Sequence, residues 1–144
     1  MITEQRKNIF CDVITNVSLW HKKDEMNDSN MKIYVIIVTY NGTKWIDKCF
    51  RSLRKSLIPI HIIAVDNNST DNTVEMIEQD YPEIELIKID KNLGFGKGNN
   101  IGLRKALAEN ADYVFLQNQD AWIEPDTIEK LVHIAQKNQE FSVL

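Results

Sequence analysis

The sequence predicts an α/β domain with a mainly parallel, doubly wound sheet, and three observations favour it. Segments rich in β-branched residues alternate with segments whose apolar residues recur at helical spacing. The first such segment, residues 34–38, is apolar throughout, which is typical of a strand buried on both faces of a parallel sheet. Polar residues follow the expected strands, at the sheet edge where such folds bind ligands. The length of 144 residues fits one domain.

Four strands and the helices between them are expected in order along the chain. The strands are predicted at residues 34–38, 60–65, 84–89 and 113–116. After the first strand, one apolar stripe predicts a helix that Pro59 ends, and its members are Ile46, Phe50, Leu53 and Leu57. Asn72 and Glu75 resemble a capping pair that opens the second helix, with Val74 and Ile77 facing inward.

Two more helices complete this β-α alternation. One follows a glycine-rich loop and runs to about Glu109. The last has Pro125 at its first turn, and its apolar face consists of Ile128, Leu131, Val132 and Ala135. Right-handed crossovers then place helices on both faces of the sheet. Residues 141–144 resemble the beginning of another strand, so the domain is expected to be incomplete at its C-terminus.

Residues 1–30 are expected to be a loosely ordered N-terminal extension, and residues 31–144 the domain itself. A modest helical pattern ends at Val17 and Trp20, and a polar run over residues 21–30 indicates a linker. The alternative is a short amphipathic helix that contacts a membrane or a partner.

Composition excludes several function classes. The net charge of −4 excludes a broad nucleic-acid footprint, so no nucleic-acid partner is expected. The longest apolar stretch, residues 33–38, is too short to span a bilayer, and no signal peptide opens the chain, so a cytoplasmic location is expected. Two cysteines and three histidines match no metal-site spacing, so no zinc site is expected.

Two of the polar strand ends have alternative interpretations. The carboxylate of Asp66 can accept hydrogen bonds from a nucleobase or a ribose, with Asn68 beside it, whereas residues 68–71 can equally serve as turn and cap residues. Asn118 and Asp120 follow the fourth strand and can hold a hard cation through oxygen atoms. The alternative for Asn118 and Asp120 is a polar turn.

The glycine-rich loop, residues 92–100, is a third candidate. Its third glycine falls one residue too early for the dinucleotide fingerprint, and the loop follows the third strand rather than the first, which excludes an NAD(P) dehydrogenase. Lys97 lacks the P-loop spacing. A glycine-rich helix start next to Lys97 nevertheless suits an anion such as a diphosphate, although many such loops only permit backbone turns.

Four blocks together, residues 35–42, 64–71, 92–100 and 116–126, resemble the family 2 glycosyltransferases with the GT-A fold, in the rhamnosyltransferase-like and galactofuranosyltransferase-like branch. The resemblance covers about residues 32–137. It implies a metal site for Mg²⁺ or Mn²⁺ at Asp120 and Asn118, where many members have Asp in place of Asn118. The nucleotide-sugar site that it implies consists of Thr39, Tyr40, Asn41, Asp66, Asn68, Asn92, Gly94, Phe95, Gly96, Asn99, Asn100, Asn118 and Gln119.

The resemblance implies transfer of a sugar from a UDP-, dTDP- or GDP-linked donor to a hydroxyl of a glycan or lipid-linked acceptor, in polysaccharide synthesis at the inner face of the membrane. In this family the catalytic base and the acceptor-binding elements come from a segment after the metal motif, so the chain is expected to hold only the donor-binding half. The alternative is a non-catalytic nucleotide-binding module or subunit. An exposed strand edge would then favour a homodimer or a partner subunit.

Overall fold

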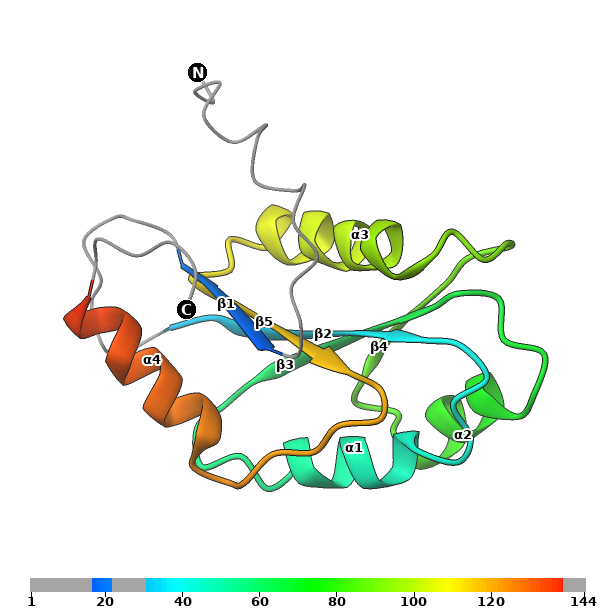
Figure 1. The fold of residues 1–144 in the computed structure, drawn as a ribbon, viewed down its shortest axis with the longest axis horizontal. Coiled ribbons are helices and arrows are strands. Elements are labelled where there is room, and N and C mark those ends of the chain that lie inside the picture. Colours follow the sequence, from blue (N-terminus) through cyan, green and yellow to red (C-terminus); the bar gives the residue numbers. More distant parts are fainter. Residues whose placement is uncertain (1–16, 22–30, 139–144) are drawn as a thin grey trace, which may run out of the picture.

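The computed structural model describes residues 17–21 and 31–138, which form one five-stranded sheet with helices on both faces (Figure 1). The strand order is β1-β5-β2-β3-β4. β5, β2, β3 and β4 run parallel, and β1 pairs antiparallel with β5 at one edge. The strands are β1 (Val17–His21), β2 (Ile33–Thr39), β3 (His61–Asp66), β4 (Glu85–Lys88) and β5 (Tyr113–Asn118).

Four helices cover the sheet, and their placement confirms the doubly wound prediction. They are α1 (Ile46–Leu53), α2 (Thr73–Asp80), α3 (Phe95–Ala108) and α4 (Thr127–Lys137). α3 lies on one face, whereas α1, α2 and α4 lie on the other (Figure 1). Within the described residues, no helix combines the length and the apolar character needed to cross a membrane.

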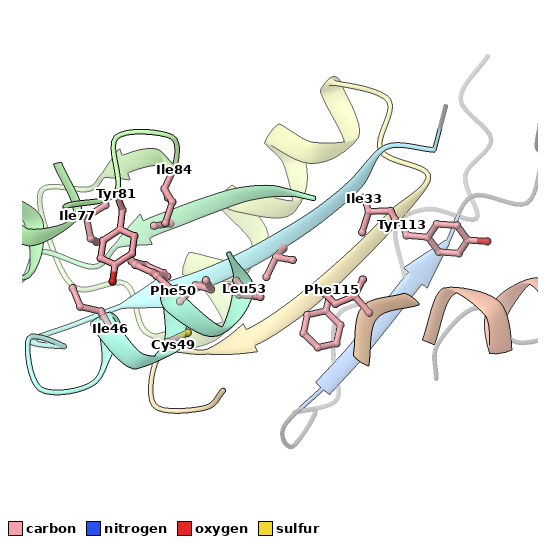
Figure 2. Packing of buried hydrophobic residues seen from close by; sticks show 14 of the residues in the cluster. Ile33, Ile46, Cys49, Phe50, Leu53, Ile77, Tyr81, Ile84, Tyr113 and Phe115 are labelled. Atoms are coloured by element: carbon pink, nitrogen blue, oxygen red, sulfur yellow. The ribbon is translucent and has the colours of Figure 1, made fainter. Parts of the chain in front are cut away.

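The alternation of side chains along β2 divides the core between the two faces. Val35 and Ile37 pack with the α1, α2 and α4 side, and Ile36 packs with α3. All seven residues of β2 are buried, as the continuous apolar run predicts. On the α1 side, the Phe50 and Tyr81 rings meet edge to face with centroids 5.0 Å apart (Figure 2).

Glycines let α3 approach the sheet closely near the site. A Cβ atom on Gly98 would lie 2.9 Å from both methyl groups of Val38, and one on Gly102 would lie 2.5 Å from Cγ2 of Ile36. Side chains at these two positions would push α3 away from β2. The glycine spacing is therefore a packing requirement of this helix.

Two helix details differ from the sequence prediction. α1 ends at Leu53, so Leu57, which was predicted on its apolar stripe, lies outside the helix and is 64% exposed. The chain turns away after residue 54, and the Leu57 N–H donates to the Pro125 carbonyl oxygen at 2.9 Å. Asn72 makes no side-chain capping hydrogen bond. Instead the Thr73 N–H donates to Oδ1 of Asp71 at 3.0 Å, so the residue before Asn72 satisfies the helix start.

The helical pattern predicted to end at Val17 and Trp20 is wrong where the structure describes it. Residues 17–21 form β1, with Val17 opposite Gln117 and His21 opposite Tyr113. An unpaired β5 edge would expose backbone N–H and C=O groups, and this segment, which includes Val17 and Trp20, can satisfy them as a strand. Residues 1–16 and 22–30 lie outside the described residues, so the domain division at residue 31 remains a prediction.

Candidate functional site

The ends of three neighbouring strands gather residues that the sequence singled out. Thr39 at the end of β2 lies opposite Asp66 at the end of β3. Asn118 at the end of β5 lies opposite Val38 of β2. The parallel sheet thus brings segments that are far apart in sequence to one edge, where doubly wound folds bind ligands.

Asp66 is 2% exposed, and its carboxylate organises the loop after β3. Oδ1 accepts hydrogen bonds from Oγ1 of Thr39 at 2.9 Å and from Oγ of Ser69 at 2.6 Å. Oδ2 accepts one from the Ser69 N–H at 2.8 Å. A carboxylate offers about four acceptor positions. These bonds use both acceptor positions of Oδ1 and one of the two on Oδ2. Any hydrogen bond from a ligand to Asp66 is therefore restricted to Oδ2.

The loops after β2 and β3 are joined through Asn41. Its N–H donates to Oγ of Ser69 at 2.9 Å, and its Oδ1 accepts from the Thr70 N–H at 2.8 Å. Asn41 and Asn68 adopt positive φ angles of 46° and 66°. Asparagine tolerates this region better than most residues, so both residues fit tight turns at the sheet edge. Asn68 is exposed beside this junction.

Asp71, which the sequence assigned only to a cap, connects the same two loops. Oδ2 accepts from Oγ1 of Thr43 at 2.8 Å, and Oδ1 accepts from the N–H and hydroxyl of Thr73. Burial by itself would raise the pKa of Asp71, but the hydrogen bonds from Thr73 and Thr43 outweigh it and hold the pKa below its ordinary value. The charged form of Asp71 therefore stabilises the folded loops.

Gln119 extends the pairing of β2 with β5 beyond the strands. Its Oε1 accepts from the Tyr40 N–H at 3.0 Å, and its Nε2 donates to the Tyr40 carbonyl oxygen at 3.1 Å. The backbone at Gly42 passes so closely that a Cβ there would lie 2.5 Å from Oε1 of Gln119. The Gln119 amide thus hydrogen-bonds the Tyr40 backbone, while the Tyr40 side chain is 44% exposed at this edge of the sheet.

The glycine-rich loop is tied to β3 by Asn67, a residue outside the predicted nucleotide-sugar site. Asn67 is 2% exposed, and its Oδ1 accepts from the Leu93 N–H at 2.8 Å. Oδ1 of Asn92 accepts from the N–H of Gly94, which has a φ of 81° and so needs glycine. The only available signal was the position of Asn67 directly after a buried strand.

The first turns of α3 present buried acceptor atoms. Asn99 is 4% exposed, and its Nδ2 donates to the Phe95 carbonyl oxygen at 3.2 Å. Within the described residues, the buried Oδ1 atoms of Asn99 and Asn100 accept no hydrogen bond. Phe95 and Gly96 are exposed, and the first turn holds no acidic residue. This helix end therefore combines an electropositive N-terminus with two oxygen atoms that lack donors.

The predicted metal ligands lie at the end of β5. Asn118 is half-buried, and Asp120 is exposed two residues later. Burial, with a smaller contribution from the Asp120 charge, raises the pKa of the Cys49 thiol on α1 to about 12. Over residues 17–21 and 31–138, no group of three or more His, Cys, Asp or Glu side chains could hold a metal. A cation at Asp120 and Asn118 would need additional ligands from bound molecules and water.

Comparisons with known proteins agree with this geometry. A family model described as Glycosyl transferase family 2 matches residues 34–144. The dTDP-rhamnosyl transferase RfbF of Shigella flexneri is 32% identical over 103 residues, which are 71% of this chain and 34% of that protein.

Two solved structures share the fold. A crystal structure of S. aureus TarS 1-349 in complex with UDP superposes with a TM-score of 0.67 and 27% identity, over 76% of this chain and 33% of that one. A mannosyltransferase from Pyrobaculum calidifontis in complex with GDP-Man and Mn²⁺ superposes with a TM-score of 0.60 and 24% identity, over 74% of this chain and 33% of that one. The chain thus spans about a third of the length of RfbF and of the two crystallised chains, of which the TarS chain is itself the 1-349 fragment.

Proposed function

The chain belongs to glycosyl transferase family 2 and has the GT-A fold, and on that premise we propose that it binds the nucleoside diphosphate sugar from which a glycosyl group is transferred. Relatives in this family include a dTDP-rhamnosyl transferase and an O-antigen chain rhamnosyltransferase. The proposed role is the donor-binding half of a transferase for cell-surface glycans, acting in the cytoplasm on a glycan or lipid-linked acceptor.

The observation that carries this proposal is the start of α3. An anionic group is favoured at a helix N-terminus, and the two buried Oδ1 atoms of Asn99 and Asn100 need hydrogen-bond donors. A nucleoside diphosphate sugar offers both, because its diphosphate is anionic and its ribose and sugar carry hydroxyl groups. The adjoining strand ends, with exposed Tyr40 and the remaining acceptor position of Asp66, would then face the base.

The residues at the end of β5 and directly after it fit Mg²⁺ or Mn²⁺. Asp120 supplies a charged oxygen and Asn118 an amide oxygen, which are ligand types that these hard cations accept. So small a protein ligand set suits a cation that takes phosphate oxygens as further ligands. When bound, the cation would neutralise the charge that develops on the departing diphosphate.

The chain's own contribution is to bind and orient the donor. Backbone N–H groups at the α3 start would stabilise the diphosphate. Inversion at the sugar carbon also requires a carboxylate base beside the acceptor. Asp126 precedes α4 and forms an ion pair with Lys130 at 2.5 Å, so its carboxylate serves the helix. In this proposal the base comes from a segment beyond the described residues.

Calorimetric titration tests the proposal. UDP, dTDP and GDP are each titrated into the chain with and without Mn²⁺, and then into Asp120→Ala and a control, Glu129→Ala, which removes an exposed carboxylate on α4. We expect one nucleotide to bind in a Mn²⁺-dependent manner to the wild type and the control, and to bind Asp120→Ala at least tenfold more weakly. Absence of nucleotide binding to the folded wild type, or equal binding to Asp120→Ala, would contradict the proposal.

A further inference from the structure

Two exposed indole rings lie at the start of α1 and in the loop after β5. Trp122 is 50% exposed, and the Lys48 ammonium lies 3.1 Å from the centroid of its ring. Trp45, directly before α1, is 39% exposed, with the Lys44 ammonium 4.4 Å from its ring centroid. Because the Lys48 and Trp122 side chains are in contact, we call these two residues the tryptophan platform.

The backbone under Trp122 is fixed on both sides. Before it, the Ala121 N–H donates to the Asn118 carbonyl oxygen at 3.2 Å. After it, the Ile123 N–H donates to Oγ of Ser52 on α1 at 3.2 Å. Further along the loop, the Pro125 carbonyl oxygen accepts from the Leu57 N–H at 2.9 Å. The exposed indole therefore stands on a preorganised loop, which reduces the entropy cost of binding.

The platform lies beside the candidate metal ligands, on the sheet face opposite α3. Trp122 follows Asp120 by two residues. Its ring meets Lys48 in the first turn of α1, next to Cys49, whose thiol lies 3.6 Å from the Asn118 carbonyl oxygen. α1 and α3 cover opposite faces of the sheet (Figure 1). A molecule on Trp122 would thus approach Asp120 from the side away from the proposed donor loop.

We propose that Trp122 is the stacking surface for a sugar ring of the acceptor, an inference that rests on the proposed function. The face of an indole ring is electron-rich, and the C–H groups on one side of a pyranose ring are weakly positive and apolar, so the two pack together. In the free protein the Lys48 ammonium lies over the face of the Trp122 ring. When a sugar takes its place, the ammonium can donate hydrogen bonds to hydroxyl groups of the acceptor.

Charge favours a neutral carbohydrate over a lipid surface as the occupant. Tryptophan and lysine together are also typical of membrane interfaces. However, exposed Glu124 lies two residues after Trp122. This carboxylate would be brought against anionic headgroups if the platform bound a membrane, and it offers a sugar an additional hydrogen-bond acceptor.

NMR of the indole N–H signals tests the inference on the full chain. The chain has three tryptophans, so Trp45→Phe and Trp122→Phe assign the three signals. Methyl α-L-rhamnoside and methyl β-D-N-acetylglucosaminide are titrated as probes, with and without UDP and Mn²⁺. We expect a saturable shift of the Trp122 signal at millimolar glycoside. Binding is expected to weaken about fivefold or more in Trp122→Ala and to be largely retained in Trp122→Phe.

A matched control and a vesicle assay separate the alternatives. Ile134→Ala removes an exposed apolar side chain on α4 and should leave the glycoside titration unchanged. Equal glycoside binding by Trp122→Ala, or no binding by the wild type, would overturn the inference. Sedimentation with phosphatidylcholine–phosphatidylglycerol vesicles that Trp122→Ala abolishes would overturn it in favour of a membrane surface.

Failure of this inference can be distinguished from failure of the proposed function. Nucleotide binding with no effect of glycosides on Trp122 refutes the acceptor surface alone. Conversely, glycoside binding at Trp122 without any nucleotide binding refutes the donor proposal, and Trp122 then belongs to a carbohydrate-binding surface of another kind.

Discussion

Two glycines in the first turns of α3 offer a matched test of how closely this helix must approach the sheet. Gly98 and Gly96 are two residues apart in the same helix, and an alanine at either removes the same backbone freedom. A Cβ at position 98 would lie 2.9 Å from both Val38 methyl groups, whereas one at position 96 would meet nothing within 4 Å. The two substitutions therefore differ mainly in packing.

The magnitude follows from two opposing contributions. Alanine is favoured over glycine inside a helix by about 0.8–1 kcal/mol, and both variants gain this. Overpacking a buried position costs about 1–3 kcal/mol, and only Gly98→Ala bears it. We expect Gly96→Ala to be more stable than the wild type by somewhat less than 1 kcal/mol. The difference between the variants isolates the packing cost, so Gly98→Ala should be about 1–3 kcal/mol less stable than Gly96→Ala.

Urea unfolding followed by circular dichroism measures this difference, and calorimetry on the same samples measures nucleotide binding. The helix start should move away from Val38 in Gly98→Ala, so nucleotide binding should weaken even where the protein remains folded. Equal free energies of unfolding for the two variants would refute the reasoning. Equal nucleotide affinity in Gly98→Ala and the wild type would show that this close approach is not needed at the site.

Three further substitutions test other parts of the site. Thr39→Val removes a buried donor to the Asp66 carboxylate and should cost about 1.5–3 kcal/mol in urea unfolding, whereas Thr39→Ser should retain most of the stability. Hydrogen bonds hold the pKa of Asp71 below its ordinary value in the folded state, so its stabilisation is present above the ordinary carboxyl pKa and is lost as pH falls through the lowered one. Asp71→Asn should therefore reduce the acid-induced decrease in Tm. Asn118→Asp adds a second carboxylate and should tighten Mn²⁺-dependent nucleotide binding severalfold by calorimetry.

The parallel part of the fold was predictable because its signals are local. The apolar run before Thr39 and the stripe that begins at Ile46 each specify an element without reference to the rest of the chain. Leu57 continues the same helical spacing and is nevertheless exposed, because its backbone bonds to Pro125, a partner 68 positions away. β1 was missed for the same reason, since its conformation depends on the open edge of β5 rather than on its own periodicity.

The positions of the site residues were also predictable, since strand ends meet at one edge of a parallel sheet. Their hydrogen-bond partners were not predictable. Nothing in the spacing shows that Asp66 accepts three hydrogen bonds from Thr39 and Ser69, or that the Gln119 amide is used by the Tyr40 backbone. Such pairings depend on side-chain rotamers and on distances between loops, which only the assembled fold determines.

These contacts divide the polar residues of the edge into two groups with different expected behaviour. Asp66 and Asp71 satisfy backbone and hydroxyl groups of the loops, so replacing them should lower stability and nucleotide binding together. Asn99 and Asn100 instead present buried acceptor oxygens that have no hydrogen-bond donor among the described residues. Because these oxygens have no donor within residues 17–21 and 31–138, Asn100→Ala removes a destabilising group and should leave the free energy of unfolding unchanged or raise it, while nucleotide-sugar binding weakens. If Asn100→Ala instead lowered both stability and binding, its carboxamide would have a structural role, and the donor proposal would lose its main support.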